Sequence, residues 1–366
     1  MRSQDAASRE VVRDALCLAA IACVSAIPSV AKLGFYSDDW GLLARYHFHG
    51  SADLFGIFPG RPVQAAHSFL LYRLFELQPL GYHLVNLAVI AAAVALLYAL
   101  LVRLKIGRFE AFAVGLVFVL LPQLSTVRVW IAASQVPLSM TFALLSLHAQ
   151  LTFARIGKPT AAIAAFAAAA LSIAAYEIFA PLIVGFALVL LWPQRRDRRA
   201  IFLVSALGTL ILAAVLYKVI ASGRAGPIAE PERYLQGAYR LVSPAYDWRV
   251  DSSLNLSAAV EVHLWLTFKG WGTALVDLVS GKFSFAAVIA ASVIALLGYW
   301  RMSAARVGPA SPLPLLLLGV AAFALGHATF LLVPSILFSP TGMANRVLVA
   351  GADGVGMIIV PAIPLL

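Results

Sequence analysis

Residues 160–192 read TAAIAAFAAAALSIAAYEIFAPLIVGFALVLLW, an apolar run in which Glu177 is the one charged residue. As a single α-helix rising 1.5 Å per residue, this run would be about 50 Å long, well beyond a hydrocarbon core of about 30 Å. Basic residues flank both of its ends, at Lys158 and Arg195, which indicates that both ends lie on the same side of a membrane. The run therefore predicts a hairpin of two short spans that turns at Tyr176-Glu177.

The rest of the chain has the same apolar character. Of its 366 residues, 62% are hydrophobic and 12% are charged, whereas soluble domains contain about 45–50% and about 25% of these classes. The apolar runs are continuous rather than alternating, which favours membrane-spanning helices over the strands of a β-barrel. We therefore expect an all-α polytopic membrane protein with a bundle of about ten transmembrane helices.

The net charge of +10 lies in short basic clusters between the apolar runs, not on a soluble segment of the kind that binds nucleic acid. Placing every cluster in the cytoplasm, by the positive-inside rule, forces the chain to reverse between each consecutive pair. The clusters are Arg2/Arg9/Arg13, Arg103/Lys105/Arg108, Arg155/Lys158, Arg195/Arg196/Arg198/Arg199 and Arg301/Arg306.

This topology divides the chain into three parts: a membrane module over 1–220 with its first exoplasmic loop at 36–80, a second exoplasmic loop over 221–282, and C-terminal transmembrane helices over 283–366. Within the first loop, Val63–Leu77 is expected to be a helix that lies flat at the membrane surface. The final run is still apolar at Leu366, which is consistent with a truncated sequence. Further spans are expected near 81–102, 129–153, 200–220, 283–300, 312–334 and 346–366, with another reversal near 121–128.

The first apolar segment, from Ala15 to Ile27, has two interpretations. It resembles a signal peptide with a cleavage site at Ser29-Val30-Ala31, or it is a retained span, which we favour because the apolar character continues to Phe35. Both cysteines lie inside this segment, where thiols behave as small hydrophobes, so they indicate no disulfide framework.

Asp38 and Asp39 follow this segment directly. Paired carboxylates at a membrane boundary suit a general base for an incoming hydroxyl, or ligands for a divalent cation such as Mg²⁺ or Mn²⁺. The alternative is the start of a helix, where Asp is a favoured capping residue. The neighbouring Tyr36 and Trp40 are candidates for substrate contact or for the aromatic belt at the interface.

Four further charged residues are candidates on the exoplasmic side. Glu177 is an acid between two apolar runs, and such acids are functional by default, although a turn residue reaching for water is the competing interpretation. Arg61, Arg128 and Arg346 stand beside apolar runs, and their guanidinium groups match phosphate oxygens. Each arginine is equally consistent with simple anchoring at the interface.

Several short motifs together carry a family resemblance. They are Gly60-Arg61-Pro62, the run from Gly81 to Leu87 that contains Tyr82, His83 and Asn86, residues 118–122, and Trp130-Ile131-Ala132. Over about residues 12–200 they resemble the amino-terminal half of GT-C membrane glycosyltransferases, of the protein O-mannosyltransferase-like and bacterial polyprenyl-phosphate-sugar-dependent types. The stretch 121–128 departs from the mannosyltransferase pattern, because it lacks the His and Glu that are frequent there.

The resemblance implies transfer of a sugar from a polyprenyl-phosphate carrier to the hydroxyl of a glycan, lipid or protein, with inversion, on the exoplasmic face of a bacterial inner membrane. It implies that Asp38 or Asp39 is the base or metal ligand, that Glu177 is a second acid, and that His83 contacts substrate. A transporter or flippase of lipid-linked glycans is the alternative. We favour the enzyme because these charges lie on one face, whereas transporters place ionisable groups at mid-depth.

Overall fold

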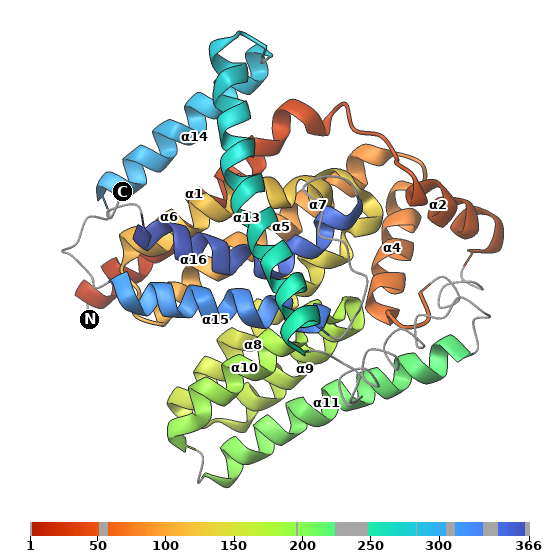
Figure 1. Cartoon of the computed structure of the whole chain (residues 1–366), viewed down its shortest axis with the longest axis vertical. Coiled ribbons are helices and arrows are strands. Elements are labelled where there is room, and N and C mark those ends of the chain that lie inside the picture. Colours follow the sequence, from red (N-terminus) through yellow and green to blue (C-terminus); the bar gives the residue numbers. More distant parts are fainter. Residues whose placement is uncertain are drawn as a thin grey trace.

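The structure, a computed structural model, describes residues 2–50, 58–194, 197–223, 248–282, 284–304, 312–331 and 343–362. These residues are almost entirely helical, and no strand occurs among them (Figure 1). The long helices are α1 (Arg2–Val30), α5 (Pro79–Arg103), α6 (Arg108–Leu120), α8 (Gln135–Ile156), α9 (Pro159–Ala175), α10 (Ala180–Leu191), α11 (Arg198–Gly223), α13 (Trp248–Val279), α14 (Phe285–Ala304), α15 (Pro312–Leu331) and α16 (Ala352–Ala362).

Shorter elements complete the fold at the helix ends. They are α2 (Asp38–His49), α4 (Pro62–Phe75), η2 (Pro122–Leu124), α7 (Ser125–Val129), η3 (Ile131–Ala133), η4 (Glu177–Phe179), η5 (Trp192–Gln194) and η6 (Met343–Gly351). The helix expected over Val63–Leu77 is present as α4, one residue longer at its start and two residues shorter at its end. Its position at a membrane surface stays a prediction.

Among the described residues, eight helical segments are long and apolar enough to cross a membrane. A bent pair, Arg108–Leu120 with Pro122–Val129, would make a ninth, with 51° between its two parts. The apolar helix α9 is shorter than these. The expected all-helical, multi-pass membrane class is therefore confirmed in outline, and the count of about ten spans stays a prediction.

The helical hairpin predicted within 160–192, with its turn at Tyr176-Glu177, is present, and its crossing of a membrane as two spans stays a prediction. α9 ends at Ala175, Tyr176 is extended, and η4 begins at Glu177 before α10 continues. The two outer ends of this hairpin lie near each other, because Arg199, just beyond α10, donates a hydrogen bond of 3.4 Å to the carbonyl oxygen of Gly157, just before α9.

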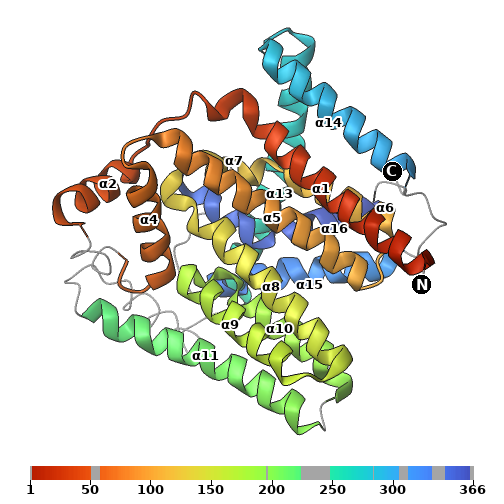
Figure 2. The same ribbon diagram turned by 180° about the vertical axis from the view of Figure 1, so that it is seen from behind.

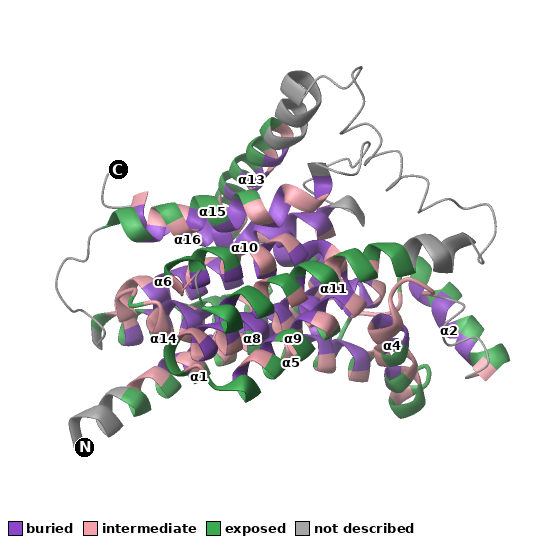
Figure 3. Cartoon of the chain, turned by 90° about the horizontal axis from the view of Figure 1, so that it is seen from below, coloured by how far each residue is buried: buried purple, intermediate pink, exposed green. Residues whose placement is uncertain are grey.

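The core is built from helices that pack through small side chains. Buried residues concentrate on the inner faces of α1, α5, α6, α8 and α16, while α11 exposes most of its surface (Figure 3). Small residues allow close approach between membrane helices. In α15, a Cβ added at Gly326 would overlap the carbonyl of Ala350, and in α16 one at Gly354 would lie 2.5 Å from the backbone nitrogen of Phe323.

One expected segment differs from the structure. The part of 221–282 expected as a loop contains α13, whose His263 and Thr267 are buried against the bundle. This helix was missed as a buried element because residues such as Glu261 and Lys269 interrupt its apolar character. The span expected over 346–366 corresponds to the candidate span Asn345–Ala362, in which the 3₁₀ helix η6 continues into α16.

The described members of the basic clusters lie together at one end of the molecule. Arg108 and Arg301 both contact Asp14 of α1, Arg155 donates to the carbonyl of Arg103, and Arg199 contacts Gly157. α2 and α4 lie at the opposite end from the two termini, as Figures 1 and 2 both show. The shared end predicted by the positive-inside rule is therefore present in the fold.

Candidate functional site

Asp39 fastens the first loop to the bundle. Its side chain is 1% exposed; Oδ2 accepts a hydrogen bond of 2.9 Å from the backbone N–H of Tyr36, and Oδ1 accepts one of 2.7 Å from that of Ala132. Burial raises the pKa of this carboxyl above its usual value, while the backbone hydrogen bonds act in the opposite direction. Asp39 is therefore a buried anchor between residues 36 and 132.

Asp38 has a different environment, although it is the adjacent residue. Its side chain is exposed at the first turn of α2, where the Ser37 hydroxyl lies 3.3 Å from its Oδ1. The helix dipole stabilises an anion at this position. Asp38 is thus a carboxylate that a substrate can reach, held in place by the anchored Asp39 beside it.

Arg61 and Glu177 form an ion pair between two predicted exoplasmic segments. Arg61 Nη2 lies 3.4 Å from Glu177 Oε1, and the two side chains are 19% and 13% exposed. The Arg61 guanidinium also lies over the ring of Tyr176, with its carbon 4.5 Å from the ring centroid. These contacts hold the Arg61 cation at the α9–α10 turn, next to the start of α4.

The other two candidate arginines differ in what they contact. Arg128 donates to the carbonyl of Val119, one of the last carbonyls of α6, which have no partner within the helix. This contact gives Arg128 a capping role. Arg346 lies over the indole of Trp130, 5.1 Å from the ring centroid, so its cation is placed two residues from Ala132, which binds Asp39.

The remaining candidates shape the first loop. His83 is buried, and its Nε2 lies 3.1 Å from the carbonyl oxygen of Gly34, which identifies it as a support for the loop rather than a surface group. Tyr36 and Trp40 are exposed. Phe35 packs edge-on against both Trp40 and Tyr82, with ring centroids 5.3 and 5.5 Å apart.

The turn region 122–133, which contains the short helices η2, α7 and η3, contacts most of these groups. It supplies the Ala132 N–H to Asp39, the Val127 carbonyl to the amide of Asn86 at 2.7 Å, and the Trp130 ring to Arg346. The segments η4 and η6 also pack together, which brings the Arg61–Glu177 pair close to the segment that carries Arg346. The structure therefore gathers the Asp38/Asp39 pair and two arginines around the same end of the bundle.

The sequence interpretation missed a buried polar group on the other side of this turn. The Gln123 amide nitrogen lies 2.9 Å from Thr267 Oγ1 and 3.2 Å from His263 Nδ1, and His263 Nε2 lies 3.3 Å from His327 Nε2. His327 Nδ1 faces the carbonyl of Phe323 at 2.9 Å and so carries a proton. Its Nε2 and that of His263 therefore share the contact between the two rings. Burial, and after it the neighbouring His327, lowers the pKa of His263 to about 3.

It also missed an ion cluster at the opposite end of the bundle, where the basic clusters lie. Asp14 of α1 is fully buried; it accepts hydrogen bonds from Tyr98 at 2.6 Å, from Arg108 at 2.6 Å and from Arg301 Nε at 2.7 Å. The signal was available, because Asp14 is an acid at the start of the first apolar segment, the same observation that identified Glu177.

The donor atoms around Asp38 do not fit a cation held by the protein alone. Both oxygens of Asp39 accept backbone hydrogen bonds, which leaves Asp38 as the accessible carboxylate. Among the described residues, no group of three or more His, Cys, Asp or Glu side chains is suitably placed for a metal ion. The predicted divalent cation stays a prediction, and no step below depends on it.

In comparisons with known proteins, the chain matches no protein-family model, no curated protein and no solved structure. The resemblance to GT-C enzymes therefore stays a prediction from short motifs.

Proposed function

We propose that this protein is an integral membrane glycosyltransferase that transfers a sugar from a polyprenyl-phosphate-linked donor to an acceptor hydroxyl on the exoplasmic face. The observation that carries the proposal is the different environment of the two adjacent acids. Asp38 is exposed, whereas Asp39 is buried and accepts hydrogen bonds from two backbone N–H groups. An accessible base on a rigid support is what general-base chemistry requires. A bacterial inner membrane is the proposed location.

In this mechanism, Asp38 accepts the proton of the acceptor hydroxyl. The hydroxyl oxygen attacks the anomeric carbon of the donor sugar, and the bond from that carbon to the phosphate oxygen breaks. The electron pair leaves with the polyprenyl phosphate, and the configuration at the anomeric carbon is inverted. The proton remains on Asp38 until it is released to solvent, so the reaction needs no further reactant.

The two arginines give the leaving phosphate a cationic environment. Arg61 and Arg346 approach from segments that pack together, and fixed cations that face developing negative charge stabilise a transition state. Glu177 keeps Arg61 in position through their 3.4 Å ion pair, so we assign it a positioning role rather than that of a second acid. Arg128 is assigned to the end of α6.

The test is transfer from a panel of radiolabelled polyprenyl-phosphate sugars, with membranes that contain the wild type or Asp38→Asn. The proposal expects label in an acceptor with the wild type and a loss of about 10²–10⁴-fold in the variant. Asp277→Asn, which removes an acid from α13, is the matched control and should keep full transfer. Asp38→Glu tests whether a displaced carboxylate restores part of the rate.

Two results would contradict the proposal. One is full transfer by Asp38→Asn at equal protein level. The other is no transfer from any donor by folded wild-type protein, with or without Mg²⁺ or Mn²⁺; translocation of a lipid-linked glycan in liposomes would then support the transporter alternative.

A further inference from the structure

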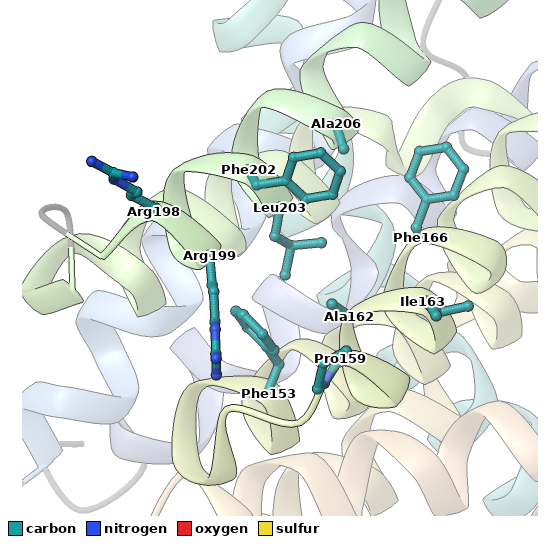
Figure 4. A pocket seen from close by; sticks show the side chains of 10 residues that line it. All are labelled: Phe153, Pro159, Ala162, Ile163, Phe166, Arg198, Arg199, Phe202, Leu203 and Ala206. Carbon is teal, nitrogen blue, oxygen red and sulfur yellow. The ribbon is translucent and has the colours of Figure 1, made fainter.

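An apolar groove lies between α9 and α11, at the end of the molecule opposite to the Asp38/Asp39 pair. Its volume is about 660 Å³, within the range of ligand-binding pockets. Figure 4 shows the side chains that line it: Phe153, Pro159, Ala162, Ile163, Phe166, Arg198, Arg199, Phe202, Leu203 and Ala206. Eight of these ten are apolar, and the two charged ones are neighbours in the first turn of α11.

The groove opens on an exposed apolar surface. Phe202 is 73% exposed and Ile163 is 67% exposed, and further large apolar side chains, such as Ile201 and Leu212, are exposed along α11. A groove with such walls excludes polar ligands from its length, because it offers them no hydrogen-bond partners. It suits a hydrocarbon chain.

One end of the groove is cationic. Arg199 extends toward the same end as Phe153 and Pro159 in Figure 4, and its Nη1 reaches the carbonyl of Gly157 at 3.4 Å. Lys158 stands between Gly157 and Pro159 and is exposed. Arg198 points away from the groove in the same view. Among the residues that the structure describes, Arg199 and Lys158 are thus cations at this end of the apolar lining.

Arg199 stands in the first turn of α11 and Lys158 is the N-cap residue of α9, so both cations lie at helix N-termini, where the helix dipole is itself positive. Asp197 accepts the backbone N–H of Arg199 at 2.8 Å and offsets only part of this charge. An added anion would interact favourably with the side chains and with the dipole together. The same end carries the other basic clusters, which the positive-inside rule assigns to the cytoplasmic leaflet, where anionic lipids are abundant.

We infer that this groove binds one anionic phospholipid, with an acyl chain along Ala162, Phe166 and Phe202 and the phosphate against Arg199 and Lys158. The apolar lining and the cations at one end match the two chemical parts of such a lipid. The inference concerns the end of the molecule away from the proposed active site and does not depend on the proposed reaction.

The test is native mass spectrometry of the full chain in detergent, titrated with dioleoyl phosphatidylglycerol, dioleoyl phosphatidylcholine, or inorganic phosphate. We expect one phosphatidylglycerol to be retained in preference to phosphatidylcholine, and phosphate alone not to be retained. Arg199→Gln should weaken phosphatidylglycerol binding by about five-fold, since one cation near a membrane surface is worth about 1 kcal/mol. Lys105→Gln removes an exposed cation from the same predicted face and should have no effect.

A second pair of variants tests the apolar part of the site. Ala162→Phe fills the groove and should abolish retention of the specific lipid, whereas Ala164→Phe adds the same ring to an exposed position of α9 outside the groove and should leave it unchanged. Equal retention of the two lipids by the wild type would overturn the inference. So would unchanged binding in both Arg199→Gln and Ala162→Phe.

Discussion

The two ends of the bundle both contain acids and arginines, but they satisfy them differently. At the end with the termini, Asp14 is fully buried and accepts hydrogen bonds from Tyr98, Arg108 and Arg301. At the other end, Asp38 is exposed beside a buried Asp39. The oxygens of a buried, fully paired carboxylate are occupied by donors of the protein itself. An exposed carboxylate is accessible to a substrate. The difference separates a group that holds helices together from a group placed for chemistry.

The largest expected effect is on folding, at the paired end. Asp14→Asn leaves Arg108 and Arg301 without their shared carboxylate inside the bundle, and breaking a buried pair in this way costs about 3–5 kcal/mol. Thermal unfolding in detergent should show a large loss of stability. Glu10→Gln, which removes an acid that contacts the same two arginines from an accessible position, should have a much smaller effect.

Asp39→Asn should lower the free energy of unfolding by about 1–3 kcal/mol. Both carboxylate oxygens accept backbone N–H groups, and an amide can replace only one of them, so that a donor faces a donor at the other. Chemical denaturation of both proteins at matched pH measures this difference. Equal stability of wild type and variant would show that the anchor is not needed.

The same residue makes a prediction about pH. Burial raises the pKa of Asp39 in the folded protein above its value in the unfolded chain, so the folded state binds this proton more tightly. Stability should therefore fall as the pH rises through the interval between the two pKa values. Unfolding measured from pH 4 to pH 7 should show this contribution in the wild type and its loss in Asp39→Asn. Identical pH slopes would contradict it.

Arg61→Gln should act on substrate binding more than on folding. Loss of one charge-assisted hydrogen bond to a phosphate corresponds to about 1.5–3 kcal/mol, or about a ten- to hundred-fold rise in KM for the donor. Glu177→Gln keeps the cation but releases its ion pair, and should raise KM less. An unchanged KM in Arg61→Gln would remove this residue from phosphate binding.

The smallest expected effect on stability is at Arg346, whose guanidinium lies over Trp130. Arg346→Gln removes a cation–π contact worth about 0.5–1 kcal/mol. Arg346→Lys keeps a cation and should retain part of it. A loss of stability as large as that expected for Asp14→Asn would mean that Arg346 is a structural residue and does not belong to the site.

The sequence predicted the helical class, because continuous apolar runs have few other structures available in a membrane. It also predicted the break at Tyr176-Glu177 from the length of the apolar run and the basic residues at both of its ends, and the common end of the basic clusters from charge. Helix boundaries such as 81–102 and 283–300 agree with α5 and α14 to within four residues. These features follow from local hydrophobicity, which the sequence displays directly.

The contacts between distant segments were not predictable in the same way. Nothing local pairs Asp14 with Arg301, or Gln123 with His263, because each pair is formed by packing of helices far apart in the sequence. The site shows the same limit: Asp38 and Asp39 are identical in type and adjacent, and they are distinguished by the burial of Asp39 and by its hydrogen bonds from the N–H groups of Tyr36 and Ala132. The acidic pair was identified from sequence, and the role of each member came from tertiary contacts.

The most direct test compares Asp38→Asn with Asp14→Asn in one experiment, by measuring glycosyl transfer per folded molecule together with the amount of folded protein. The account predicts that Asp38→Asn folds at wild-type level and loses transfer, and that Asp14→Asn loses folded protein while the surviving molecules keep their transfer rate. Full transfer per molecule in Asp38→Asn would contradict it.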